Sequence, residues 1–375
     1  MSSFPEFDRS RIHQKPLRER RNKVDISKIY VKTTDPAPEL SPRAAELIGK
    51  TAEAMLRARA GGRSVMLAFG AHSIKNGLGP LMVEFLRNGW ITHLATNGAG
   101  IIHDWEFAYQ GLSSEAVYEN LPRGEFGTWE ETGFSINMAI AAGVWQGYGY
   151  GAAVGKVIAE QGLRIPSEEE LTEIIRGGGD MDRVAASADM LTAVRKAGLA
   201  PGWYEIPAPF GRYSLQAGAF GLGVASTAHP MFGHDIIYTH HLNSGGAIGR
   251  AAELDFLSYV DSASNLNGGV YLSVGTAVMS PMVFEKAYSM VQNAALQSGG
   301  ALDRHRIVVV DLAEPRWDWF TNGEPPRSNP EYHTPYMKSF LRSRPVSMDF
   351  LTADNRDFLL ALYHELSKTK YLNNG

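Results

Sequence analysis

The sequence of 375 residues predicts an α/β protein with one parallel sheet that carries helices on both faces. Three observations predict this fold class: short apolar runs recur along the chain, helical patterns separate them, and glycine-rich segments follow several of the runs. Strands that alternate with helices form parallel sheets, because each crossover helix returns the chain to the same edge. We expect a single domain over residues 35–375, since no repeat or long linker interrupts the alternation.

Residues 1–34 carry a row of basic side chains with few apolar anchors between them: Arg9, Arg11, Lys15, Arg18, Arg20, Arg21 and Lys23. A segment of this composition has too little apolar surface to form a core of its own. We therefore expect an extended basic arm that lies over the surface of the domain or over a neighbouring subunit.

The first half of the domain begins with a helix whose start and end are both marked. Ser41 and Pro42 are an N-cap followed by a proline at the first helical position, and Gly61 ends the helix. The pattern then predicts a strand at 64–69, a helix at 79–89, a strand at 91–96 and a long helical stretch at 132–157.

The second half of the domain continues the alternation. Ser167 and Glu170 form a capping box that opens a helix. The later elements predicted are a strand at 236–239, a helix at 247–260, a strand at 269–274, a helix at 281–297, a strand at 306–311 and a helix at 354–368. Residues 314–344 are rich in proline and polar side chains and are expected to form a long loop, which in a compact domain is usually functional or mobile.

The composition excludes several classes of function. The absence of cysteine excludes disulfides, thiolate metal sites and a cysteine nucleophile. The net charge of −4 argues against nucleic acid as a partner, because phosphate binding favours a basic surface. No apolar run reaches the roughly 18 residues that a membrane span needs, and the polar N-terminus lacks a secretory signal, so we expect a cytoplasmic protein without membrane partners.

Three glycine-bearing segments are candidates for ligand binding: residues 69–79, 96–104 and 243–250. Each follows a predicted strand, and parallel sheets bind ligands where loops and helix N-termini follow the strands. Glycine lets the backbone approach a phosphate or a nicotinamide ring without a Cβ between them. None of the three segments matches the G-x-G-x-x-G fingerprint of standard nicotinamide-binding sites.

Four histidines, His229, His234, His240 and His241, lie within thirteen residues of each other. Their spacing does not fit a helical metal-binding pair and no acidic residue lies at a matching interval, so we predict no metal site. His240 and His241 at the end of the strand predicted at 236–239 would point to opposite faces, and one of the two could face a ligand.

His103 and Asp104 are the more suggestive pair, because a carboxylate beside an imidazole can fix its tautomer or raise its basicity. Lys75, beside the first glycine-bearing segment, is a candidate point charge for an anionic substrate or a nucleophile, or else a solvated residue at a helix start. Glu130 and Glu131 could bind a cation or could simply begin a solvated helix.

Taken in order, these segments resemble the deoxyhypusine synthase superfamily over roughly residues 64–370. The resemblance implies a Rossmann-like parallel sheet, a homotetramer, and NAD bound at subunit interfaces. Members of that family oxidise an amine of spermidine and pass the aminobutyl group through an enzyme lysine. The cofactor-binding residues that the resemblance implies are Ala71, His72, Thr96, Asn97, Gly98, Ala99, Gly100, Asp318, Ala353 and Asp354.

The departures from the family pattern concern its chemistry. Phe350 stands at the place of the imine-forming lysine, Ser280 at that of the catalytic histidine, and His103 at that of the glutamate that holds the polyamine. These residues supply neither an amine for a covalent imine nor a carboxylate for a substrate cation. The resemblance therefore implies a divergent branch that does not make deoxyhypusine.

The function predicted from the sequence is that of an NAD-dependent enzyme that oxidises an amine or alcohol of a small polar metabolite, transiently or in net. His103 or His240 would accept the proton, and the histidine at position 103 indicates a less cationic substrate. Two alternatives remain: a transferase or lyase without redox chemistry, with Lys75 or Lys338 as nucleophile, and a non-catalytic homo-oligomer.

Overall fold

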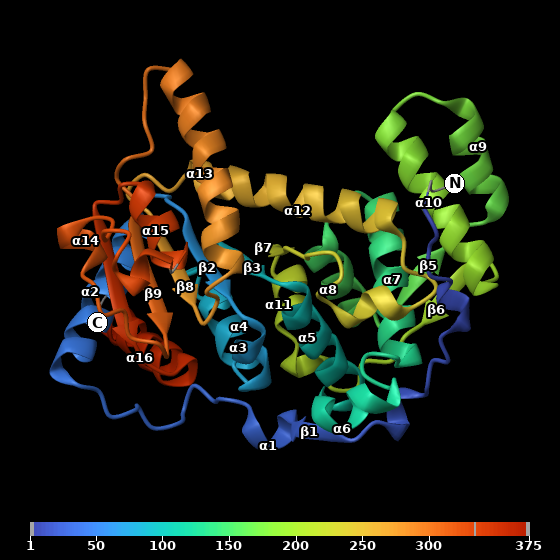
Figure 1. The fold of residues 1–375 in the computed structure, drawn as a ribbon, viewed down its shortest axis with the longest axis horizontal. Coiled ribbons are helices and arrows are strands. Elements are labelled where there is room, and N and C mark those ends of the chain that lie inside the picture. Colours follow the sequence, from blue (N-terminus) through green and yellow to red (C-terminus); the bar gives the residue numbers. More distant parts are fainter. Residues whose placement is uncertain (1–3, 334, 373–375) are drawn as a thin grey trace.

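A computed structural model of the protein describes residues 4–333 and 335–372. At its centre is a six-stranded sheet in the order β10-β9-β8-β2-β3-β7, with every neighbouring pair parallel (Figure 1). The strands are β2 (Val65–Phe69), β3 (His93–Thr96), β7 (Ala225–Ala228), β8 (Val270–Val274), β9 (Arg306–Asp311) and β10 (Ser347–Thr352).

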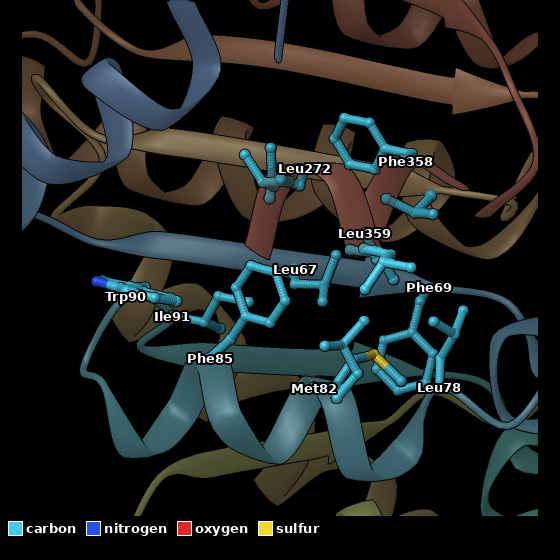
Figure 2. Packing of buried hydrophobic residues seen from close by; sticks show 14 of the residues in the cluster. Leu67, Phe69, Leu78, Met82, Phe85, Trp90, Ile91, Leu272, Phe358 and Leu359 are labelled. Carbon is cyan, nitrogen blue, oxygen red and sulfur yellow. The ribbon is translucent and has the colours of Figure 1, made fainter. Parts of the chain in front are cut away.

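Helices cover both faces of this sheet, which confirms the predicted fold class. One face packs against α2 (Pro42–Ala60), α4 (Gly79–Arg87) and α16 (Asn355–Leu372). The other packs against α12 (Gly245–Ser264), α13 (Met279–Gln297) and α15 (Pro335–Arg342). Side chains alternate along each strand, so Leu67 and Leu272 point towards Phe358 of α16 (Figure 2), whereas their neighbours Met66 and Tyr271 belong to the opposite cluster. All five residues of β2 are buried, as expected for a strand covered on both sides.

A second hydrophobic cluster lies in a helical part beyond β7 (Figure 1). It is built mainly from α5 (Gly98–Gln110), α7 (Glu130–Trp145), α8 (Tyr150–Glu160), α9 (Glu168–Gly177) and α10 (Met181–Ala197). α12 joins the two parts, because Ala251 near its start belongs to this cluster and Tyr259 near its end belongs to the sheet. The stretch predicted as one helix at 132–157 is two helices, separated at Gly147, whose φ is 85°.

The basic arm packs against this helical part of its own chain. Leu17 is fully buried, and β1 (Asn22–Asp25) pairs antiparallel with β4 (Leu112–Glu115). Arg9 donates to the side chain of Asn243 at 2.8 Å. The remaining short elements are α1 (Ile26–Ile29), α3 (Ala71–Lys75), α6 (Val117–Asn120), β5 (Gly162–Ile165), β6 (Gly202–Glu205), α11 (Leu215–Gly221) and α14 (Trp319–Asn322).

The prediction was wrong at several elements. The run at 236–239 is a 3₁₀ helix, in which the Thr239 hydroxyl donates to the carbonyl of Ile236. Strand β7 was missed, because its sequence Ala-Ser-Thr-Ala has no large apolar residue, and so was β10. The expected loop at 314–344 contains α14 and α15. Within the described residues, no helix has the length and apolar character needed to cross a membrane.

Candidate functional site

The carboxyl ends of all six strands lie at one edge of the sheet. The chain leaves β2 towards β3 on one side and leaves β8 towards β9 on the other, so the strand order reverses between β2 and β8. Open parallel sheets bind ligands outside such a reversal point. Gly70 and Gly275 follow these two strands and are in close contact, because a Cβ on Gly70 would overlap the carbonyl oxygen of Gly275. This edge is therefore where a functional site is expected.

The first and last predicted cofactor-binding segments come together at this edge. Asn355, the first residue of α16, accepts a hydrogen bond from Asn76 at 2.9 Å, and its amide nitrogen lies 3.2 Å from the hydroxyl of Ser73 in α3. Ala353 and Asp354 therefore lie beside the helix that begins with Ala71 and His72. Asp354 itself accepts from the backbone of Arg356 at 2.8 Å, which stabilises the start of α16.

The second predicted segment follows β3 at the same edge. Thr96 donates to the carbonyl oxygen of Phe69 at 3.1 Å, and Asn97 caps α5 by accepting from the backbone of Gly100 at 3.0 Å. A Cβ on Gly100 would overlap the side chain of Thr96. A Cβ on Gly98 would overlap the carboxylate of Asp235. Both glycines thus have a packing reason inside the chain, and their role towards a dinucleotide stays a prediction.

His103, on α5, faces the helix α3. Its Nδ1 lies 2.7 Å from the hydroxyl of Ser113. Burial lowers the pKa of His103 to about 4; Glu106 acts in the opposite direction, and the charges of Lys75, Arg20 and His72 lower the pKa further. The structure therefore brings three predicted site residues, His72, Lys75 and His103, into one neighbourhood, with the histidine neutral at pH 7.

Asp104 is not the partner of His103, and the predicted pair is wrong in that respect. Asp104 accepts from the hydroxyl of Ser214 at 2.5 Å and from the backbone of Leu215 and Gln216 at 2.8 and 3.1 Å, so it caps α11. Successive side chains on a helix project about 100° apart, which separates the two residues. Burial raises the pKa of Asp104 to about 6 in spite of these donors.

His240 lies in the helical part, against Gly133 of α7. Its Nε2 is 3.3 Å from a carboxylate oxygen of Glu130, and its Nδ1 accepts from the backbone of Leu242 at 3.3 Å. The rings of His240 and His241 have their centroids 4.5 Å apart, so the expectation that they point to opposite faces is wrong. They follow a 3₁₀ helix and not a strand, which removes the alternation of side chains on which that expectation depended.

Residues 243–250 also differ from the expectation. They follow the 3₁₀ helix at 236–239 and form the start of α12, where Ser244 caps the helix by accepting from the backbone of Ala247.

Glu131, a candidate for binding a cation, accepts from the backbone of Leu17 at 2.5 Å. Within the part of the chain that the structure describes, no group of three His, Cys, Asp or Glu side chains could hold a metal ion.

Asp318 and Phe350 lie apart from the predicted residues that follow β2 and β3. Both line a pocket of about 600 Å³ along the outer edge of β10. Strand β10 is three strands from β2, which is about 14 Å at the usual spacing. Asp318 caps α14 by accepting from the backbone of Thr321 at 3.0 Å. Within one chain, Asp318 is therefore not gathered with Ala71 and His72.

Two further residues singled out from the sequence have partners inside the chain. Lys338 pairs with Glu324 at 2.7 Å, and its ammonium lies 3.6 Å from the centre of the Tyr332 ring. Ser280 is fully buried and shares a hydrogen bond of 2.8 Å with the hydroxyl of Tyr271.

Three polar residues that the sequence analysis did not select form a cluster near the start of α5. Asp235 Oδ2 and the hydroxyls of Tyr150 and Tyr238 are buried and have no hydrogen-bond partner among the described residues. Asp235 lies against Gly98, at the end of β3. The three act on one another, since the Asp235 charge adds to burial in raising the pKa of Tyr150 well above 10 and that of Tyr238 to about 12.

The electrostatic environment of this cluster is acidic. Burial raises the pKa of Asp235 to about 6, and among the described residues no positive charge acts against that shift. Asp255 adds a further carboxyl group on the side of Tyr150. A ligand that donates hydrogen bonds or carries a positive charge fits such a site, whereas an anion is repelled. In the sequence, this cluster was indicated only by the position of Asp235 among the histidines at 229–241.

No family model matches this chain, and no curated protein matches it either. Among solved structures, unliganded AgrE is similar over 88% of this chain and 34% of its own, at 12% identity and a TM-score of 0.45. A putative LOR/SDH protein from Methanococcus maripaludis S2 (92% of this chain, 73% of its own) has 12% identity and a TM-score of 0.39. A putative deoxyhypusine synthase from Entamoeba histolytica (87% and 88%) has 8% identity and a TM-score of 0.38.

The chain spans about a third of the length of AgrE. All three TM-scores lie below 0.5, so these likenesses carry no argument about the activity of this chain. The α/β fold with its parallel sheet follows from the strand order and helix packing given above.

Proposed function

We propose that this chain is an NAD-dependent enzyme that oxidises a small organic amine at the carboxyl edge of its sheet. The observation that supports this best is the half-buried Asp235, whose Oδ2 is buried beside two hydroxyls that also lack partners. A buried carboxyl oxygen without a hydrogen-bond donor is costly, and more so when the group is ionised. The ammonium group of a ligand would supply both the missing donors and the missing charge.

The chemistry around Asp235 favours a cation. Tyr150 and Tyr238 stay neutral at pH 7, and each hydroxyl oxygen can accept a hydrogen bond from an ammonium group. The Tyr238 ring lies 5.3 Å from that of Phe232, and aromatic faces attract cations. The proposal thus departs from the expectation of a less cationic substrate, which depended on the histidine at position 103 alone.

His103 is the residue we propose as proton acceptor. At pH 7 its imidazole is neutral, the form that can take up a proton when the C–N bond of an amine is oxidised. It lies on the same helix as Gly98, which contacts Asp235. His103 is five positions after Gly98, which is about 7.5 Å along the helix axis and about 140° around it. A substrate held at Asp235 would therefore have to reach around the start of α5 to meet His103.

The residues at this edge also fit NAD. The N–H groups of Gly98 and Ala99 begin a helix of 13 residues and have no acceptor within it. Because the Asp235 carboxylate lies against Gly98, an uncharged acceptor of NAD, such as its carboxamide oxygen, suits these donors better than a phosphate. Ala71 and His72 follow β2 at the strand reversal, and Asn355 bonds to their helix, so Ala353 and Asp354 would bind the same ligand from the other side. NAD would supply the acceptor for the hydride.

Calorimetric titration with 1,4-diaminobutane tests the proposal, with 1,4-butanediol as the uncharged control of the same length. The diamine is expected to bind wild type, and Asp235→Asn is expected to weaken it at least tenfold. Asp318→Asn, which changes an aspartate in the other pocket, is the matched control and should leave binding unchanged. Equal binding of the diamine to wild type and Asp235→Asn contradicts the proposal, and preference for the diol would point to an alcohol substrate.

A transferase without redox chemistry is the second candidate, because Lys75 lies close enough to His103 to lower its pKa. We further propose that the chain forms a homo-oligomer, a tetramer as the resemblance to the deoxyhypusine synthase superfamily implies. Light scattering should then give a mass well above 41.1 kDa at micromolar concentration, and a stable monomer would contradict it.

A further inference from the structure

We infer that Ser113, Glu106 and Arg20 are positioning residues that hold His103 as the tautomer protonated on Nδ1, leaving the Nε2 lone pair for the substrate. The inference deepens the proposed function, since it rests on His103 as the proton acceptor. It also gives the basic arm a part in the site, because Arg20 belongs to that arm.

A continuous row of short hydrogen bonds connects these residues. His103 Nδ1 lies 2.7 Å from Ser113 Oγ, which donates to Glu106 Oε2 at 2.5 Å. Arg20 donates to both oxygens of Glu106, at 2.5 and 2.6 Å. Thr132 donates to Oε1 of the same carboxylate at 3.2 Å. Each oxygen of the Glu106 carboxylate therefore accepts two hydrogen bonds, which fills its roughly four acceptor sites.

The number of available protons determines the direction of each bond. Burial acts to raise the pKa of Glu106, but the charge and hydrogen bonds of Arg20 hold it below the ordinary value, so the carboxylate only accepts. Ser113 has one hydroxyl proton, which it donates to Glu106. Its oxygen can then only accept from His103, so Nδ1 must carry the hydrogen. A serine that donated to His103 would leave a fully buried carboxylate oxygen without this donor.

The other ring nitrogen of His103 is left open. Nε2 has no hydrogen-bond partner among the described residues and is not among their buried unpartnered atoms. The groups that act on the imidazole from the elements around it are Glu106 on its own helix, Lys75 and His72 on α3, and Arg20 on the arm. Three of these four favour the neutral ring, whose Nε2 can accept a proton.

This row of hydrogen bonds also predicts how substitutions in it change the tautomer of His103. Without Arg20 the buried Glu106 would take up a proton, and a protonated Glu106 can donate to Ser113. Ser113 would then donate to Nδ1, which moves the hydrogen of His103 to Nε2. Removing the Ser113 hydroxyl takes away the acceptor at Nδ1 altogether.

The test is a long-range ¹H–¹⁵N spectrum of the full chain with ¹⁵N-labelled histidine, recorded near pH 7 without NAD or amine. The His103 signals are assigned by their loss in His103→Gln. The wild-type spectrum should show hydrogen on Nδ1 and a bare Nε2. Ser113→Ala should lose the Nδ1 hydrogen. The matched control is Ser343→Ala, which removes the hydroxyl 2.9 Å from His305 and should leave the His103 signals unchanged.

A wild-type His103 with its hydrogen on Nε2, or with both nitrogens protonated, overturns the inference without any variant. An unchanged tautomer in a folded Ser113→Ala protein overturns it as well. The result is separable from the proposed function. If the tautomer is as inferred but Asp235→Asn still binds the diamine, the positioning row stands and the assignment of an amine substrate fails.

Discussion

Arg20 and Glu106 form a doubly hydrogen-bonded ion pair in which each side chain is only 1% exposed, although 86 residues separate them in the sequence. The pair joins the basic arm to α5, the helix that carries His103. Fold and candidate site therefore share one buried interaction, and changes to it should affect both.

Arg20→Met should lower the free energy of unfolding by about 3–5 kcal/mol, because it leaves the buried carboxylate of Glu106 without its charge partner. The double variant Arg20→Met with Glu106→Leu should be less destabilised, since no charge is left uncompensated. Arg164→Met breaks an exposed pair with Glu170 and should cost at most about 1 kcal/mol. Urea denaturation measures all three, and a loss below 1 kcal/mol in Arg20→Met would refute the account.

Gly100→Ala should destabilise the protein by about 1–3 kcal/mol even without a ligand, because the new Cβ overlaps Thr96. Gly49→Ala is the matched control in α2, where nothing lies within 4 Å of an added Cβ. Removing a glycine from a helix interior should stabilise by about 0.5–1 kcal/mol. Thermal melting measures the stability of both variants against wild type. Equal stability of Gly100→Ala and wild type would show that the packing around Thr96 is looser than described.

Binding of 1,4-diaminobutane should strengthen as the pH rises towards 7. Burial raises the pKa of Asp235 to about 6, so the group is a neutral acid below that pH and a carboxylate above it, whereas the diamine stays charged throughout. Affinity should rise by up to about tenfold per pH unit below 6 and level off above it. Asp235→Asn should bind weakly at every pH. Calorimetry between pH 5 and 8 would contradict the assignment if the wild-type affinity did not change.

Treatment with spermidine, NAD and borohydride should leave no adduct on the protein. The resemblance to the deoxyhypusine synthase superfamily implies that Phe350 stands at the place of the imine-forming lysine, and a phenylalanine cannot form an imine. Phe350→Lys alone should not restore transfer, because the resemblance implies that Ser280 and His103 also depart from the family pattern, and catalytic groups act together. Intact-mass spectrometry is the measurement. An aminobutyl adduct on Lys75 or Lys338 would support the transferase alternative instead.

The elements that were predicted correctly have strong local signals in the sequence, such as a helix cap or a continuous apolar run. The helix after Ser41, the capped start at Ser167 and the buried run of β8 are all confirmed. Elements whose stability comes from tertiary contacts could not be predicted from the sequence. β7 lacks large apolar residues, and the short run Ile-Ile-Tyr-Thr at 236–239 fits a strand or a helix equally well.

The candidate site was predictable only where it follows a strand. His72, Lys75 and His103 come together because their segments follow neighbouring parallel strands. Asp104 could not be placed from the sequence, since its partners lie more than a hundred residues away on α11. Asp235, Tyr150 and Tyr238 were missed for a similar reason, because their relation depends on burial without partners, which only the folded chain reveals.

Calorimetric titration of the purified chain with NAD tests the central claim of an NAD-dependent enzyme most directly. The account predicts saturable binding of one NAD per chain, with Asn97→Leu weakening it by removing the cap of α5 and Asp303→Asn, at an exposed side chain, leaving it unchanged. Circular dichroism would show that each protein is folded. No saturable binding at millimolar NAD in the folded wild type would contradict the claim.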